Sequence, residues 1–246
     1  TAAQELLTAS DELTEEADKL TTAAALATFS PAVVTCVYNP LRYARSAYRR
    51  YLASYAQDGI DTAFLGMNPG PYGMVQTGIP FGDVLTVTDW LGITESVTPP
   101  THQHPARPVL GFSCTRREIS GSRLWGLFIK RFGTPDRFFA EHFVLNYCPL
   151  AFLEDSGRNI TPDKLHGPAM QSLLAACDRH LAAAMTALRP RWVVCLGAYA
   201  EKRARACLPQ EQRVFRLLHP SPANPLANAG WAEKATADLT AAGIWE

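Results

Sequence analysis

Residues 66–84 read GMNPGPYGMVQTGIPFGDV, and they follow the short apolar run TAFL at 62–65. An apolar run that ends in Gly-Met-Asn-Pro-Gly-Pro predicts a strand followed by a loop at the carboxyl edge of a sheet. Glycine lets such a loop approach a ligand closely, and proline stiffens it. Ligands of open α/β sheets bind at this edge. The stretch therefore predicts an α/β fold whose active-site loop is 66–84.

Further apolar runs repeat this pattern along the chain. Strands are expected at 61–66, 142–147, 191–197 and 213–220. The run RWVVCLG is apolar enough for a strand that is buried on both faces. Helical segments separate the strands, which predicts a three-layer αβα fold with a short, four-stranded parallel sheet. The strand ends then point the same way, and three of them carry a polar tip: Asn68, Asn146 and His219.

The helices are expected around these strands. The predicted helices are 4–27, 39–56, 83–91, 122–132, 161–188, one after 197, and 229–242. Asn39-Pro40 and Thr161-Pro162 each combine a capping residue with a proline for the first turn, so both pairs should begin helices. Residues 93–121 carry four prolines and are expected to form an irregular surface excursion. No linker or repeat divides the chain, so 1–246 should form one domain.

The composition indicates the general class of protein to which the chain belongs. Hydrophobic residues make up 47% of the chain and charged residues 19%, as in ordinary globular proteins. No run approaches the roughly 18 apolar residues of a membrane span, and no signal peptide is expected at the start. The six cysteines are widely spaced without a CxxC pair, which argues against disulfides and for a reducing compartment. An intracellular protein is expected, cytoplasmic in a bacterium or nuclear in a eukaryote.

The charge balance bears on nucleic-acid binding. The formal net charge is zero, which argues against a protein that coats nucleic acid through bulk positive charge. Local basic clusters, such as the four arginines within 42–50, are compatible with a restricted contact, although most such clusters are solvated helix faces.

Several catalytic motifs are missing from the chain. It has no nucleophile elbow, no phosphate-cradling GxxxxGK[ST], no HExxH and no pair of carboxylates at the strand ends. No metal and no cofactor are therefore expected. A site made of two asparagines and a histidine needs a labile bond and good positioning rather than a strong base.

Four blocks of the sequence resemble those of a known family. The blocks are GMNPGPYGMVQTGIPFGDV, EISGSRLWGLF, NYCPLAFLEDSGRNITP and LLHPSPANPLANAGW, which together span about residues 61–231. They are similar in content, order and spacing to the single-strand-selective monofunctional uracil-DNA glycosylases. The resemblance implies the uracil-DNA glycosylase fold and the removal of uracil and 5-hydroxymethyluracil from DNA by hydrolysis of the N-glycosidic bond, without a metal.

The resemblance implies catalytic roles for Asn68 and His219. Asn68 would hold a water beneath C1′ of the sugar, although an Asn in a tight turn is also a common structural feature. His219 would direct a ring nitrogen at uracil O2, where negative charge accumulates, and the backbone amide of Met67 would donate to the same oxygen. Without the HPSPANP context, a lone histidine after an apolar strand is more often structural.

The resemblance also implies how the base is recognised. Asn146 would accept a hydrogen bond from uracil N3–H and donate one to O4, a pattern that cytosine reverses. Phe81 would stack on the flipped base; the alternative is a core residue. Gly70 is the position at which more uracil-specific enzymes carry a tyrosine that blocks C5, so glycine here should leave room for a hydroxymethyl group.

The predicted DNA contacts lie in two loops. Ser122, at a helix start, and Pro220 with Ser221, in the HPSP loop, are candidates to hold the DNA backbone. The family pattern continues HPSP with an arginine that helps to fill the gap left by the extruded base, whereas this chain has Ala223. Base flipping is least costly in single strands, so we expect weaker activity on paired duplex.

Two other functions stay open at this point. One is a non-catalytic module that binds damaged DNA or nucleotides on the same fold. The other is a glycosylase that prefers deaminated purines, xanthine or hypoxanthine. For the preferred interpretation we expect a monomer that binds single- and double-stranded DNA and leaves an abasic site without cutting the strand, because the motif blocks offer no lysine nucleophile.

Overall fold

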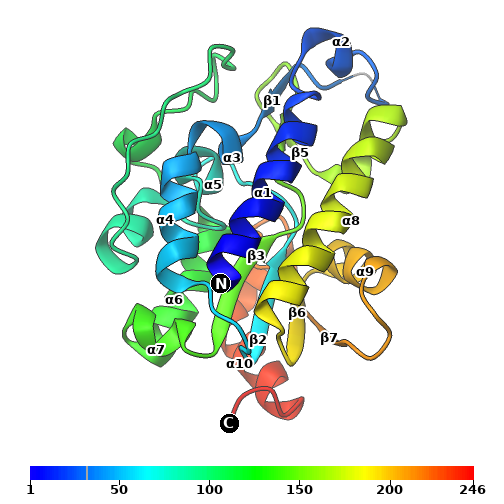
Figure 1. The fold of residues 1–246 in the computed structure, drawn as a ribbon. Coiled ribbons are helices and arrows are strands. Elements are labelled where there is room, and N and C mark those ends of the chain that lie inside the picture. Colours follow the sequence, from blue (N-terminus) through cyan, green and yellow to red (C-terminus); the bar gives the residue numbers. More distant parts are fainter. Residues whose placement is uncertain (32) are drawn as a thin grey trace.

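A four-stranded parallel sheet forms the centre of the structure, in the strand order β3-β2-β6-β7 (Figure 1). The structure is a computed structural model and describes residues 1–31 and 33–246. The strands are β2 (Thr62–Gly66), β3 (His142–Asn146), β6 (Trp192–Leu196) and β7 (Arg213–Leu217). The central strands β2 and β6 are apolar and almost entirely buried. The predicted parallel sheet is therefore confirmed.

A second, smaller sheet was not expected from the sequence. It is antiparallel and consists of β1 (Cys36–Tyr38), β4 (Ala151–Leu153) and β5 (Asn159–Ile160). Strands of two or three residues are too short to show an alternating pattern, which explains why they were missed. Its strand β5 brings a polar residue, Asn159, close to the carboxyl ends of the parallel strands.

Helices cover both faces of the parallel sheet. The helices are α1 (Ala2–Asp18), α2 (Ala23–Leu26), α3 (Pro40–Tyr43), α4 (Arg45–Tyr55), α5 (Met74–Thr77), α6 (Ile119–Phe132), α7 (Pro135–Phe139), α8 (Pro168–Leu188), α9 (Ala198–Cys207) and α10 (Trp231–Ala241). Short helical turns occur at Thr86–Trp90, Gly111–Ser113, Pro162–Lys164 and Pro225–Ala229. None of the helices in the described residues is both long and apolar enough to span a lipid bilayer.

Aromatic contacts show which helix lies on which face. Phe64 of β2 packs against Phe128 of α6, with ring centroids 4.9 Å apart. Phe143 of β3 pairs with Ala63, the neighbour of Phe64, so Phe143 points to the opposite face. There it contacts Tyr51 of α4 at 5.0 Å. Helices α1, α4 and α8 lie side by side on this second face (Figure 1), whereas α6 and α10 cover the first.

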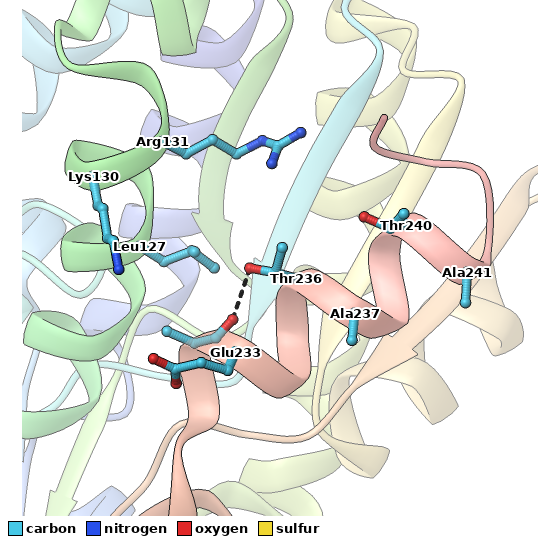
Figure 2. A pocket seen from close by; sticks show the side chains of 9 residues that line it. Leu127, Lys130, Arg131, Glu233, Thr236, Ala237, Thr240 and Ala241 are labelled. Atoms are coloured by element: carbon cyan, nitrogen blue, oxygen red, sulfur yellow. Dashed lines mark hydrogen bonds between the residues drawn. The ribbon is translucent and has the colours of Figure 1, made fainter.

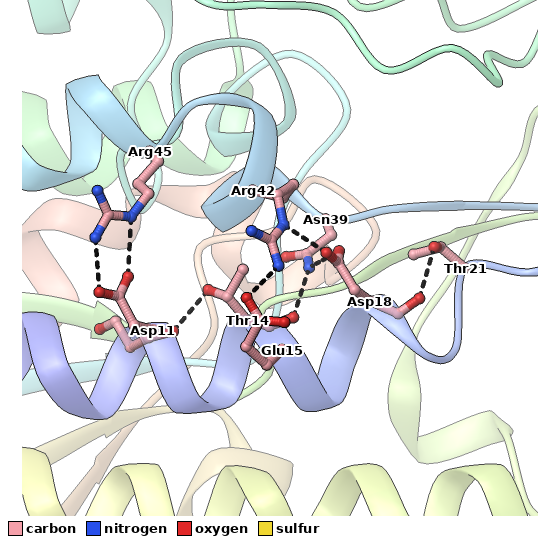
Figure 3. A network of polar contacts seen from close by, with 9 residues as sticks. Asp11, Thr14, Glu15, Asp18, Thr21, Asn39, Arg42 and Arg45 are labelled. Atoms are coloured by element: carbon pink, nitrogen blue, oxygen red, sulfur yellow. Dashed lines mark hydrogen bonds and ion pairs between the residues drawn. The ribbon is translucent and has the colours of Figure 1, made fainter.

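The N-terminal half corrects two predicted helices. The first helix ends at Asp18 instead of residue 27. The second is broken at Ala44 into α3 and α4, and Asn39 makes no capping bond. The Asn39 amide instead donates to Thr14 O at 3.3 Å and to Asp18 Oδ1 at 2.7 Å (Figure 3). A long-range hydrogen-bond network therefore holds the Asn39 side chain, which the local sequence pattern predicts to be a helix cap.

The same network occupies part of the basic cluster at 42–50. Arg45 makes a two-point contact with Asp11, at 3.0 and 2.6 Å, and Arg42 pairs with Glu15 and Asp18 of α1 (Figure 3). These arginines tie α1 to α3 and α4. Both side chains are paired with carboxylates of α1 and remain partly exposed.

Other helix boundaries also differ from the predicted ones. Thr161-Pro162 begins only the short turn Pro162–Lys164, and the long helix α8 starts at Pro168. The helix expected at 83–91 contains one π-helical turn, and α6 starts at Ile119, three residues before the predicted 122. The expected irregular excursion is found between these two segments, apart from the turn Gly111–Ser113.

Candidate active site

A cavity of about 580 Å³ opens at the carboxyl ends of the parallel strands. Its walls come from the 66–84 loop, the start of α6, the segment after β4 and the loop after β7. The lining residues are Met67, Asn68, Pro69, Gly70, Pro71, Phe81, Glu118, Ser120, Asn159, Thr161, His219, Ser221, Pro222, Ala223, Asn224 and Pro225. Of the nucleobase-contacting residues predicted from sequence, only Asn146 is not among them.

A larger cavity, of about 750 Å³, lies elsewhere between α6 and α10 (Figure 2). Alanines and threonines of α10 line one wall, and Leu127, Lys130 and Arg131 of α6 line the other. No residue from a strand end reaches this cavity. The polar groups suited to chemistry therefore gather in the smaller cavity.

Asn68 is held by its amide and presents its oxygen. The loop after β2 places the half-buried side chain in the cavity wall, and Nδ2 donates to Leu150 O at 3.0 Å. This bond uses the donor end of the carboxamide, which leaves Oδ1 as an acceptor for a water or a hydroxyl. A carboxamide is scarcely basic, so the group can position a water but cannot deprotonate it.

His219 is a neutral hydrogen-bond donor in this structure. The backbone N–H of Ser221 donates to its Nδ1 at 3.0 Å, so Nδ1 carries no proton. Burial lowers the pKa of His219 to about 4, because it disfavours the imidazolium form. The proton of the neutral ring therefore lies on Nε2. A neutral donor in the cavity suits an oxygen on which negative charge develops.

Asn146 lies next to Phe81, which lines the cavity. A Cβ on Gly66 would come within 2.4 Å of Asn146 Oδ1 and within 2.4 Å of Phe81 Cε2, so both side chains pack against the bare Gly66 backbone. Asn146 is 9% exposed, and its Nδ2 contacts Met74 Sδ at 3.4 Å. Within residues 1–31 and 33–246, Oδ1 is buried without a hydrogen-bond partner. An unpaired buried acceptor is costly, which points to a ligand donor as its partner.

Phe81 is held in a strained backbone conformation. Its φ of 59° is in the left-handed region, which is rare for a bulky residue. A Cβ on Gly121 of α6 would lie 1.9 Å from Phe81 O, so only glycine at 121 allows this close packing. The Phe81 and His219 ring centroids are 6.2 Å apart. Strain of this kind concentrates at functional sites, and here it fixes an aromatic face beside the histidine.

A buried carboxylate, Asp83, anchors the same loop. It also binds Ser122, which was predicted to contact the DNA backbone. Asp83 accepts from Thr86 N–H at 3.1 Å and from Ser122 Oγ at 3.2 Å, and it pairs with Arg117. Burial raises the pKa of Asp83, but the bonds from Arg117 and Thr86 together outweigh it and lower the pKa. The Ser122 hydroxyl is thus turned inward, and Ser120 is the serine of α6 that lines the cavity.

The HPSP loop forms the rim of the cavity. Ser221 and Ala223 line it, and Ser221 Oγ accepts from Ala223 N–H at 3.1 Å. Pro220 is buried, and its carbonyl accepts from Arg123 of α6 at 2.9 Å. Arg123 also donates to Asn228 Oδ1 at 2.8 Å, so it fastens both ends of the rim. Sequence reasoning missed Arg123.

Five polar residues of the wall were also missed: Asn224 in the loop after β7, and four others, Glu118, Ser120, Asn159 and Thr161. The other four lie inside the sequence blocks EISG and GRNITP, and Asn224 lies inside HPSPANP; this was the only available signal. These four come from α6 and from the second sheet, so no strand-end pattern could indicate them. In the described part of the chain, no group of three or more His, Cys, Asp or Glu side chains is arranged to hold a metal ion.

Comparisons with known proteins show the family of the chain. A sequence profile described as the Uracil DNA glycosylase superfamily matches residues 53–240. The single-strand selective monofunctional uracil-DNA glycosylase of Rattus norvegicus is 48% identical over 217 residues, which cover 87% of this chain and 78% of the rat protein. The Bos taurus protein of the same name is 47% identical over 215 residues, or 86% of this chain and 79% of the bovine protein.

A solved structure shares the fold. The crystal structure of wild-type SMUG2 from Pedobacter heparinus superposes with a TM-score of 0.61, covers 96% of this chain and 99% of its own, and is 19% identical. At that identity the likeness concerns the fold alone. The profile match and the two mammalian relatives decide the family: the chain belongs to the uracil-DNA glycosylase superfamily and, within it, to the single-strand-selective monofunctional uracil-DNA glycosylases.

Proposed function

We propose that the cavity at the strand ends is the active site, with Asn68 and His219 as its catalytic residues and Asn146 as its base-reading residue. One observation carries the proposal. A held carboxamide and a neutral imidazole donor line one cavity beside a fixed aromatic ring, and an unpaired buried acceptor, Asn146 Oδ1, lies next to that ring. As a member of its family the chain is a uracil-DNA glycosylase, a hydrolase of N-glycosyl bonds that acts in base excision repair.

The proposed reaction begins with a flipped base in the cavity. Uracil stacks on Phe81, and its N3–H donates to the unpaired Asn146 Oδ1. The glycosidic bond breaks largely ahead of attack, so the base leaves as an anion. His219 Nε2–H, aided by the Met67 amide, stabilises the charge on O2. Asn68 Oδ1 holds the water that adds to C1′ of the sugar. The water loses a proton as it adds to C1′, and the uracil anion takes up a proton through solvent, so the products are free uracil and an abasic site.

The substrate range is a further part of the proposal. We include 5-hydroxymethyluracil, and we expect single-stranded DNA to be preferred because an alanine at 223 is a poor wedge for opening a duplex. The names of the mammalian relatives support single-strand selectivity. Those names also support monofunctional chemistry, as does the lining of the cavity, which includes no lysine among the described residues. Xanthine and hypoxanthine are the alternative bases.

We also propose the domain organisation, the compartment and the oligomeric state of the protein. The larger of the two hydrophobic clusters among the described residues includes side chains from Leu6 to Trp245, which supports a single domain over 1–246. We also propose an intracellular monomer. All six cysteines are free in the described structure, as a reducing compartment would allow.

Release of free uracil from a labelled single-stranded oligonucleotide tests the function. We expect wild-type protein to release uracil, and Asn68→Ala and His219→Ala each to lower kcat by about 10²–10³-fold. DNA affinity should change less, because both contacts strengthen as charge develops. A wild-type protein that binds the oligonucleotide without releasing base would support the non-catalytic alternative. A product trapped by borohydride would contradict monofunctional chemistry.

A further inference from the structure

Two arginines of the irregular segment 93–121 converge on the ring of Tyr72. The Cζ of Arg116 lies 4.1 Å from the centroid of this ring, and that of Arg107 lies 5.8 Å from it. Tyr72 directly follows Pro71, which lines the cavity at the strand ends. An aromatic face attracts a guanidinium group and holds it in place, while the N–H groups at its edge stay available. Two cations are therefore held next to the cavity.

Neither of these arginines is neutralised by a carboxylate in the described part of the chain. The neighbouring Arg117 pairs with Asp83, whereas Arg107 and Arg116 form no ion pair. Arg116 is exposed, and Arg107 is half-buried, with Nη1 donating to the Ala106 carbonyl at 2.8 Å. A guanidinium group without a carboxylate partner is well suited to a phosphate, to which it can donate two parallel hydrogen bonds.

The segment that carries the two arginines is fastened to the rest of the fold. The hydroxyl of Tyr38, in β1, donates to Arg107 O at 2.7 Å. The buried side chain of Gln76, in α5, accepts from the backbone N–H groups of Leu110 and Gly111 at 2.7 and 3.1 Å. These bonds tie the segment to the loop that also carries the tyrosine. A cation that is held in place before binding loses less freedom when its ligand arrives.

The charge of the whole protein favours a phosphate-binding role for these cations. The formal net charge is zero, so the chain cannot attract DNA through bulk positive charge and depends on local cations near the site. The family pattern has an arginine at the position of Ala223, on the rim formed by the HPSP loop. That position supplies no cation in this chain. The wall formed by the 66–84 loop, in contrast, has two of them beside it.

We propose that Arg107 and Arg116, held by Tyr72, bind phosphates of the DNA strand on one side of the flipped nucleotide. This inference rests on the proposed function, because the cavity determines where the flipped nucleotide lies. The strand then passes over the wall that ends at Pro71, and the nucleotides on the other side of the lesion do not reach these arginines. The 93–121 segment thereby gains a function as part of the DNA-binding surface.

Binding of an undamaged, fluorescently labelled single-stranded oligonucleotide tests this surface without any release of base. Arg116→Gln should weaken binding about three- to tenfold at low salt. The slope of the logarithm of Kd against the logarithm of the salt concentration should fall by about 0.7, as expected for one lost phosphate contact on a single strand. Arg116→Lys keeps the charge and should keep the slope.

The matched control is Arg213→Gln. Arg213 is also exposed and lies over an aromatic ring, that of Trp192, with its Cζ 5.5 Å from the ring centroid. Both residues lie at the amino ends of their strands, at the opposite edge of the sheet from the cavity. The control removes the same charge and should change neither affinity nor slope appreciably. Equal weakening by the two substitutions, or an unchanged slope in Arg116→Gln, overturns the inference.

Shortened substrates show on which side of the lesion the arginines act. Uracil release is measured as kcat/KM on a strand extended on both sides of the uracil, on one without the 5′ nucleotides and on one without the 3′ nucleotides. The double variant Arg107→Gln/Arg116→Gln should lower kcat/KM about tenfold or more on the extended strand, and this fall should vanish on only one of the shortened strands. An equal effect on both shortened strands overturns the inference. If the wild-type protein releases no uracil, the proposed function fails, and the binding measurement still decides whether the arginines hold DNA.

Discussion

The neutral ring of His219 carries its proton on Nε2. The Ser221 N–H occupies Nδ1, and burial lowers the pKa to about 4, so the ring is neutral with Nε2–H at physiological pH. A neutral donor stabilises a developing anion without first holding a charge that burial disfavours. The proposed catalytic group is therefore a fixed dipole that needs no proton from solvent.

This assignment predicts the pH dependence of the chemical step. Because the folded pKa is lowered, His219 stays neutral as the pH falls through 6.5 and becomes protonated only near pH 4. We expect the single-turnover rate of uracil release to be nearly constant from about pH 8 to 5.5, and then to fall as the proton on Nδ1 displaces the Ser221 bond. Rapid-quench measurements across this range check it. A rate that rises tenfold through pH 6.5 would identify an imidazolium instead.

Asn146 predicts a change of base preference. Its unpaired Oδ1 suits the N3–H of uracil, whereas N3 of cytosine is an acceptor. A protonated carboxyl group can donate to that acceptor, so Asn146→Asp should excise cytosine at a detectable rate while uracil excision falls about 10²-fold or more. Competing single-stranded substrates with one uracil or one cytosine measure the ratio. An unchanged preference would remove Asn146 from the base-reading role.

The loop after β7 depends on α6 for its shape. Arg123 bridges Pro220 O and Asn228 Oδ1, and the Asn228 amide donates to Pro222 O at 3.0 Å. We therefore expect Arg123 to position the proposed catalytic His219 without touching substrate. The rigidity of the rim therefore depends on its hydrogen bonds to α6.

Removal of the bridge should loosen the rim. We expect Arg123→Ala to lower kcat/KM for uracil excision about tenfold, since a small displacement of a catalytic group is costly. The thermal midpoint should move by only a few degrees, because Arg123 is half-exposed. Arg137→Ala on α7 serves as the comparison, because Arg137 is exposed and does not line the cavity. Equal losses in the two variants would refute the positioning role.

Strands were easier to predict than helix ends. The runs at β2, β3 and β6 are apolar because both of their faces are buried, and this pattern is legible in one sequence. Helix caps depend on competition with distant partners. Asn39 is bound by α1, and Thr161-Pro162 leads into a short turn before Pro168 starts α8. Such partners are fixed by tertiary structure, so local sequence could not show them.

The topology explains which part of the site was predictable. In a parallel sheet the carboxyl ends of all strands meet at one edge, so Asn68, Asn146 and His219 could be grouped before any coordinates were known. Glu118 and Asn159 follow no strand of that sheet. The first enters from the long irregular segment and the second from the small antiparallel sheet. Their approach required the three-dimensional path of the chain.

The rim of the cavity also bears on strand preference. Ala223 is exposed there, and Leu226 nearby is 68% exposed. The larger apolar side chain that could act as a wedge, Leu226, therefore lies three residues after the position at which the family pattern has an arginine. We expect Ala223→Arg to raise duplex activity relative to single-strand activity about five- to tenfold, because a larger wedge offsets the cost of unpairing. Uracil release from matched duplex and single strands measures the ratio.

A charge control is needed because the protein has no net charge. Ala206→Arg adds the same charge at an exposed position of α9 that does not line the cavity. If it shifts the duplex ratio as much as Ala223→Arg does, general attraction to DNA explains the gain. An unchanged ratio in Ala223→Arg would exclude the wedge explanation.

The bond from Ser221 N–H to His219 has a consequence for mutational mapping. Alanine scanning trims side chains but leaves every main-chain amide in place, so it cannot erase the group that orients this imidazole. Among the twenty amino acids only proline lacks that amide hydrogen. The main-chain path therefore determines which nitrogen of His219 carries the proton, and side-chain truncations cannot reveal this.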